Sequence, residues 1–185
     1  MPGTAIGKQM NLGYPGSYSR NGDCQIMARP VYASDTNGPN FGDPLVVNSD
    51  STGGTYSSVA DLYLRAGTLA MTNFAGVAVR EVKTFETYTA ASLGGYAPGL
   101  MCDCITRGSV NVVVTNGTPQ AHGAVWVRTV AGSLATPVGG FECATASDGG
   151  TCVQITNAEF TTGVTSTDAN GNVIAEITLI NKSAA

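Results

Sequence analysis

Residues 170–181 read NGNVIAEITLIN and predict a β-strand that follows a tight turn. Apolar side chains at every second position would share one face of this strand: Val173, Ala175, Ile177 and Leu179. Glu176 and Thr178 would lie on the other face, where Ile174 and Ile180 interrupt the alternation. Asn170 and Gly171 tolerate the positive φ angles that tight hairpin turns demand. This stretch therefore predicts that the chain folds as β-sheet.

Similar β-prone runs recur through most of the chain between clusters of turn-forming residues. They cover residues 24–34, 44–48, 76–89, 101–106, 109–115, 122–130, 138–144, 151–156 and 172–181. Two further turn signals, Asn116-Gly117 and Asp148-Gly149-Gly150, are of the kind found in hairpins. Only residues 56–71 suit a mainly helical segment, because their Leu and Val residues loosely follow a helical stripe. These features predict an all-β sandwich or barrel with few or no helices.

The first 23 residues differ in pattern from the rest of the chain. They contain several glycines, two prolines and no sustained periodicity, which predicts an extended N-terminal arm. Residues 24–185 show no break in composition and are long enough for one hydrophobic core, so a single β-sandwich domain is expected there. The alternative for the arm is a frayed terminus that contacts nothing.

The composition excludes several classes of partner. Charged residues make up 12% of the chain, against roughly 25% in an ordinary soluble domain, so much of the surface must be uncharged. A net charge of -4 without a Lys/Arg run argues against nucleic acid. No apolar stretch approaches the roughly 18 residues that cross a bilayer, and the N-terminus lacks a signal-peptide core. We expect a soluble protein that has no membrane partner and is not exported by the usual route.

The five cysteines predict neither a disulfide framework nor a metal site. The number is odd, and a chain that is not exported folds among reduced thiols. Cys102 and Cys104 would share one face of a strand, but zinc needs two further ligands, so small buried side chains are the simpler interpretation. Cys143 and Cys152 flank a predicted turn and would face each other across a hairpin, where they would oxidise after cell lysis. No cofactor is predicted.

Catalytic residues are difficult to assemble from this sequence. The single histidine, His122, precedes Gly123 at the start of a β-prone run and is predicted to be a turn or surface residue. The Gly-x-Ser-x-Gly motif of a nucleophile elbow is absent. We therefore predict that the protein is not an enzyme. A hydrolase that depends on His122 or a carboxylate is the last of the alternatives, since triads are recognised by geometry and not by counting.

Three parts of the chain resemble the phage structural cement protein family. Residues 14–20 read YPGSYSR and precede a β-prone run, as an extended Pro-Gly segment and an arginine do in that family. Residues 76–81 read GVAVRE, similar to the family's glycine-valine strand with its arginine. RGSVNV at 107–112 and GAVWVR at 123–128 are similar to its valine-rich and glycine-aromatic-valine strands. The order of these pieces is more specific than any one of them, while the 48–54 loop and the Cys102-Asp103-Cys104 sequence depart from the family.

The resemblance implies a jelly-roll-like β-sandwich without catalytic residues. Such a protein would be made in the host bacterial cytoplasm and would bind the outer surface of a tailed-phage capsid. It would bridge neighbouring major capsid proteins, stabilise the expanded shell and associate with itself, as a dimer in preference to a trimer. The alternative function is a carbohydrate-binding or adhesive β-sandwich module, which would stack sugars on exposed aromatic side chains.

The candidate partner-contact residues lie in the predicted arm. They are Tyr14, Tyr18 and Arg20, because aromatic residues and arginine dominate binding hot spots. An arm folded back on its own sandwich is the alternative. Trp126 alternates with Val125 and Val127 and would lie on the second sheet surface or at a subunit interface.

Overall fold

The computed structural model describes residues 15–48, 54–66, 73–80, 94–134, 136–167 and 171–180. These residues form nine strands and one short helix: β1 (Tyr18–Pro30), β2 (Pro44–Asn48), β3 (Thr55–Ser58), α1 (Val59–Ala66), β4 (Phe74–Ala78), β5 (Met101–Asn116), β6 (Ala124–Val130), β7 (Phe141–Glu142), β8 (Thr151–Thr167) and β9 (Val173–Leu179). No helix in these ranges has the length and apolarity to cross a membrane. The prediction of an all-β fold with few helices is confirmed.

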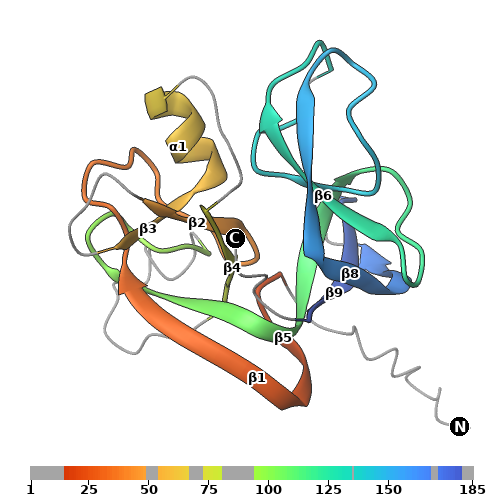
Figure 1. Ribbon diagram of the computed structural model, residues 1–185, viewed down its shortest axis with the longest axis horizontal. Helices are drawn as coiled ribbons and strands as arrows, with labels where there is room; N and C mark the ends of the chain where they lie inside the picture. Colours follow the sequence, from red (N-terminus) through yellow and green to blue (C-terminus); the bar gives the residue numbers. More distant parts are fainter. Residues whose placement is uncertain are drawn as a thin grey trace, which may run out of the picture.

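The long strand β5 belongs to two sheets that lie side by side (Figure 1). Its first half pairs with β1 on one edge and with β4 on the other, and β4 continues through β2 to β3. Its second half pairs with β9 and β7, and these connect through β8 and β6 into a closed ring. We call β1, β2, β3, β4 and the first half of β5 the N-terminal sheet, and the ring the C-terminal barrel.

Apolar side chains fill the interior of the C-terminal barrel because they alternate along its strands. Val110, Val112 and Val114 of β5 are buried there with Ile177 and Leu179 of β9. The strand predicted from residues 172–181 is thus β9, and its alternation serves the barrel core. A second apolar cluster in the N-terminal sheet contains Leu45, Tyr56, Tyr96, Cys102 and Cys104.

Two predicted elements have different bounds in the structure. Residues 101–106 and 109–115 were expected to be two strands, but β5 is continuous because Gly108 keeps an extended path with a φ of 114°. The predicted helix at 56–71 is shorter. Residues up to Ser58 pair with β2 as strand β3, and α1 covers Val59–Ala66.

The turn signals were correct for local conformation and only partly correct for pairing. β8 and β9 form the hairpin predicted at Asn170-Gly171, of which Asn170 lies outside the described residues. The other two predicted hairpins are wrong, because β6 pairs with β7 and β8, which leaves neither β5–β6 nor β7–β8 pairing. Gly117 and Gly149 still have positive φ values of 88° and 80°. Turn residues determine the local backbone angles, but they do not determine which strands pair with each other.

Asp61 joins the start of α1 to the loop that precedes β2. Ser58 Oγ accepts the Asp61 N–H at 3.0 Å and donates to Asp61 Oδ2 at 3.1 Å, so Ser58 caps the N-terminus of α1. The same carboxylate accepts the backbone N–H groups of Thr36, Asn37 and Gly38 at 3.1, 3.2 and 2.9 Å. Asp61 is buried, and these hydrogen bonds replace the water that its charge loses.

We predict that Asp61→Ala lowers the free energy of unfolding by about 2–5 kcal/mol. Three backbone N–H groups and the hydroxyl of the capping residue Ser58 would lose the carboxylate that accepts their hydrogen bonds. Urea unfolding measures the loss. The matched control is Asp23→Ala, which removes an exposed ion pair with Arg107 and should change stability by about 0–1 kcal/mol. Equal losses in the two variants would contradict the role assigned to Asp61.

Candidate functional site

Exposed apolar side chains lie along β1 and the adjoining start of β5. Tyr18, Ile26 and Met27 of β1 are each 42% exposed, and Leu100 and Met101 next to them are 43% and 53% exposed. Pro30 pairs with Met101, so Met101 belongs to the β1–β5 ladder, and Leu100 directly precedes it. Ile26 and Met27 are adjacent in β1, so their side chains lie on its two opposite faces. We call these five residues the β1 surface. Several exposed apolar residues on one element indicate an interaction surface, whereas single ones do not.

The β1 surface is held rigidly because β1 is fixed to β5 along its length. Over Tyr18–Pro30, β5 is the only named strand among the described residues that pairs with β1. The register shifts three times, between Tyr18 and Arg20, between Arg20 and Gln25, and between Gln25 and Ile26. The largest shift leaves the residues between Arg20 and Gln25 bulged opposite Gly108. Figure 1 shows β1 lying along β5 on the side of the molecule opposite to α1.

The three predicted contact residues differ in where they fall. Tyr18 is the first residue of β1 and is exposed. Arg20 also lies in β1 and pairs with Ser109 of β5. Residues 18–23, which were assigned to the arm, are the beginning of β1. Tyr14 lies outside the described residues. Ile26 and Met27 were not singled out from the sequence, since an exposed apolar residue in a strand looks like a buried one.

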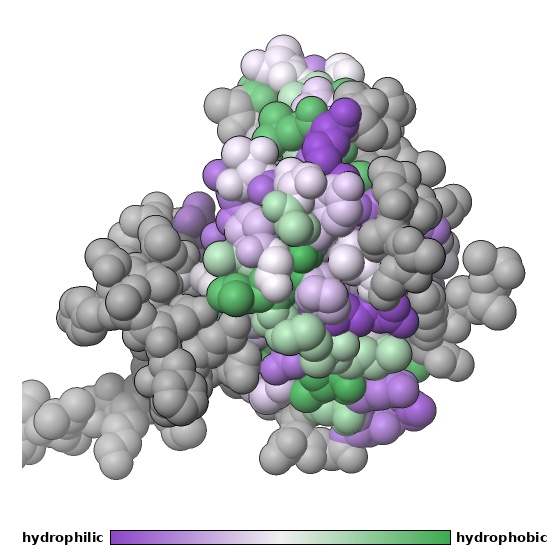
Figure 2. All heavy atoms as spheres, turned by 90° about the vertical axis from the view of Figure 1, so that its left-hand side faces the viewer, coloured by the Kyte–Doolittle hydropathy of each residue, from purple (hydrophilic) through white to green (hydrophobic). Residues whose placement is uncertain are grey.

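The face seen in Figure 2 has several separate apolar areas with polar residues between them. This view looks onto the left-hand side of Figure 1, where the N-terminal sheet and α1 lie. Such a mixed composition is ordinary for surfaces that form non-obligate interfaces, in which a polar rim surrounds a small apolar centre.

A buried ion cluster organises the loops on the outer face of the C-terminal barrel. Arg128 on β6 is fully buried, and its Nε lies 2.5 Å from Glu142 Oε1. Its Nη1 donates to both carboxylate oxygens of Asp148 at 3.0 and 3.1 Å. The Asp148 carbonyl accepts the N–H and hydroxyl of Ser133, each at 3.0 Å. Arg128 therefore ties the loop after β6 to the loop before β8.

The pKa values of this cluster follow from its contacts. Burial alone would lower the pKa of Arg128, but its hydrogen bonds to Glu142 and Asp148 raise it. The hydrogen bond from Arg128 lowers the pKa of Asp148 below its usual range. Arg128 and Asp148 are therefore both charged at neutral pH. This cluster was not predictable from the sequence, because a single arginine after a valine-rich run resembles an ordinary residue on the outer face of a strand.

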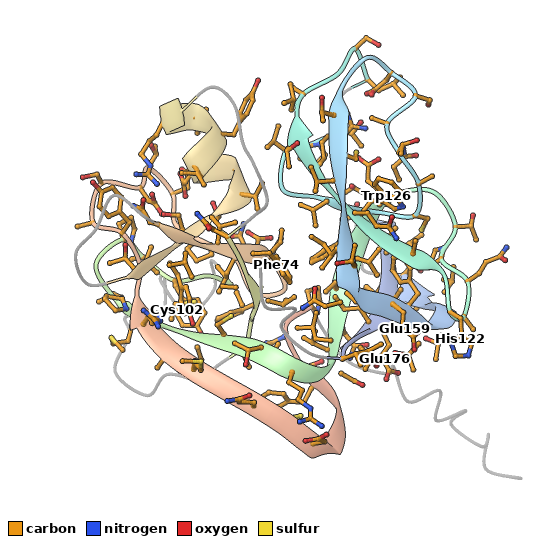
Figure 3. All side chains as sticks on the ribbon, viewed as in Figure 1. Phe74, Cys102, His122, Trp126, Glu159 and Glu176 are labelled. Carbon is orange, nitrogen blue, oxygen red and sulfur yellow. The ribbon has the colours of Figure 1, made fainter. Side chains whose placement is uncertain are left out.

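The residues considered for catalysis or metal binding form no such site in the described residues. His122 lies in a turn with a φ of 61°, and its exposed ring has Nδ1 3.4 Å from Glu159 Oε2 (Figure 3). Cys102 and Cys104 are buried in the N-terminal sheet, as small core side chains. Within the described part of the chain, no group of three or more His, Cys, Asp or Glu is placed to hold a metal ion.

Cys143 and Cys152 do not face each other across a hairpin, and that prediction is wrong. β6 lies between β7 and β8, so the two cysteines are on opposite sides of β6, and both thiols are free. Burial raises the pKa of each thiol to about 11, which keeps it protonated and weakly reactive at neutral pH. Trp126 is half-buried on the outer face of the barrel, where it pairs with Glu142 and Gln154.

Replacing Arg128 tests the cluster directly. We expect Arg128→Met to lower the free energy of unfolding by about 3–5 kcal/mol, because two buried carboxylates lose their cation. Arg107→Met, at an exposed ion pair, is the matched control and should change stability by about 0–1 kcal/mol. Adding Glu142→Gln and Asp148→Asn to Arg128→Met should restore part of the loss in thermal unfolding. A loss no larger than that of the control would show that the cluster is dispensable.

Comparison with known proteins agrees with this all-β architecture. The sequence model described as "Structural cement protein (E217 gp24/Pam3 gp6)", a phage cement family, matches residues 1–180. No curated protein matches the sequence significantly. Among solved structures, a chain from "The capsid of Myoviridae Phage XM1" has a TM-score of 0.60 and 14% sequence identity, with 100% of both chains covered. That likeness establishes a shared fold, and the match over residues 1–180 shows that the chain belongs to the phage structural cement protein family.

Proposed function

We propose that this protein binds the outer surface of the expanded capsid of a tailed phage, bridges neighbouring major capsid proteins and stabilises the shell. The observation that carries the proposal is the family match over residues 1–180, which supports a role in capsid cement or decoration. The family is a structural one and not a family of enzymes.

The stabilising mechanism is thermodynamic linkage. A protein that binds only the assembled, expanded lattice lowers the free energy of that lattice relative to separated subunits. A single bridge with a dissociation constant of about 1 μM contributes roughly 8 kcal/mol at the standard state. Contacts to several neighbours at once raise the effective affinity further. Interfaces of modest size are therefore sufficient for a cement.

We assign the capsid contact to the β1 surface and the segment around it. Tyr18 and Arg20 remain our proposed contact residues, and Ile26 and Met27 extend the same strand with exposed apolar area. A binding surface on a continuous ladder loses little conformational entropy on docking. The charged residues of β1 are Arg20, Asp23 and Arg29, of which Asp23 forms an exposed ion pair with Arg107 of β5. We further propose self-association as a dimer at local two-fold axes, where closed symmetry fits the lattice.

Co-sedimentation with expanded capsids that lack the protein tests the function. We expect saturable binding to expanded shells, weaker binding to unexpanded shells, and a higher disruption temperature for decorated particles. Binding without a rise in disruption temperature would contradict the proposed stabilisation of the shell. Absence of binding would favour the adhesive alternative, for which a glycan array is the next measurement.

The β1 surface is tested by Tyr18→Ala in the same assay. We expect the affinity for expanded capsids to fall about 10- to 30-fold, as for a hot-spot aromatic. Leu64→Ala is the matched control, because Leu64 is 63% exposed but lies on α1, on the opposite side from β1 (Figure 1). An unchanged affinity for the Tyr18 variant, with normal binding by the wild type, would place the contact elsewhere on the protein.

A further inference from the structure

A groove of about 750 Å³ lies between the start of β2 and α1 on one side and the outer face of the C-terminal barrel on the other. Apolar residues from both sides line it: Phe41, Pro44, Val59, Val113, Val138 and Phe141. Pro15, where the described chain begins, forms part of the same wall. An apolar groove between two sheets suits an extended segment that presents apolar side chains on one side.

The chain enters the groove at a fixed point. The Gly16 N–H donates to the Asn111 carbonyl at 2.8 Å, and the Gly16 carbonyl accepts the Arg80 N–H at 2.8 Å. A Cβ at Gly16 would lie 2.9 Å from backbone atoms of Ala78, Arg80 and Gly42, on two neighbouring segments, so only glycine fits this passage. Pro15 is thereby held on the groove wall, and the residues before it start from a rigid attachment.

The direction of β1 leads the preceding residues into the groove. β1 runs antiparallel to β5, and the Asn111 N–H donates to the Ser17 carbonyl at 3.1 Å. Toward its N-terminus the chain thus advances along β5 in the direction of Val113. From Val114 onward β7 pairs with this edge of β5 while β9 holds the other edge. Pro15 and Val113 both line the groove, so the segment before Pro15 is attached at the groove wall.

The sequence before Pro15 has the pattern that such a groove requires. Met10, Leu12 and Tyr14 alternate with polar residues and a glycine. In an extended backbone successive side chains point to opposite sides, so these three would share one side. Five extended residues span roughly 17 Å.

We propose that residues 10–14 bind in the groove of their own chain, with Met10, Leu12 and Tyr14 against its apolar lining. A segment tethered at the groove wall has a high effective concentration there, which favours it over the same segment of a second copy. The contact joins the N-terminal sheet to the C-terminal barrel and leaves residues 1–9, with a reach of about 30 Å, for partners. This inference concerns the free protein and does not depend on the proposed function.

Photo-crosslinking of the full chain in solution tests the proposal. Leu12→p-benzoylphenylalanine should attach to groove residues such as Val113 and Val138 on irradiation. Asn11→p-benzoylphenylalanine, one position out of phase, should give at least a fivefold lower yield on those residues. Irradiating a mixture of isotope-labelled and unlabelled chains distinguishes the source of the segment. Adducts within one chain are expected, whereas mixed adducts would assign the groove to a neighbouring copy and overturn the proposal.

Two further variants test whether the crosslink depends on the lining of the groove. Val138→Glu places a charge in the lining and should reduce the Leu12 adducts at least fivefold. Leu134→Glu, in the same loop and 60% exposed outside the lining, should leave their yield unchanged. Unchanged adducts in the Val138 variant, or no adducts to groove residues in the parent, would also overturn the proposal.

Discussion

The continuous hydrogen-bonded ladder of β5 is the constraint on which the rest of the structure depends. One strand, Met101–Asn116, is a wall of the N-terminal sheet in its first half and of the C-terminal barrel in its second half. The two parts are therefore joined by backbone hydrogen bonds and not by a linker. Gly108 lies where the strand passes from one to the other, and β1 bulges opposite it to follow the change of direction. The groove and the β1 surface take their positions from this strand.

Most strands were predictable from the sequence because alternation and turn residues are local signals. The alternation of residues 172–181 found β9, and residues 44–48 are β2. Pairing was less predictable, since partner strands are chosen by contacts distant in sequence. The insertion of β6 between β7 and β8 overturned two hairpins and the expected neighbourhood of Cys143 and Cys152. Arg107-Gly108 was taken as a break for the same reason, because a glycine that ends a strand and one that bends it look alike.

The candidate site was predictable only in part, because the sequence does not show which of its side chains are buried and which are exposed. Tyr18 was found as an aromatic residue next to an arginine, and it is exposed at the start of β1. Ile26 and Met27 have the same apolar character as core residues, and only the tertiary structure shows that they are exposed, with no other described element covering them. Arg128 is the opposite case. Its charge predicted exposure, but the loop that carries Asp148 folds over it and turns it into a buried anchor.

In the proposed role of bridging capsid subunits, the direction in which β1 is attached to β5 matters. A load applied along β1 acts in shear on the ladder with β5, so several hydrogen bonds resist it together and no single one has to break first. β5 passes the load into the C-terminal barrel through its ladder with β9. The barrel closes into a ring through the short strand β7, and the Arg128 cluster holds its outer loops. The same strand that presents the proposed contact surface thus also distributes the force across the whole fold.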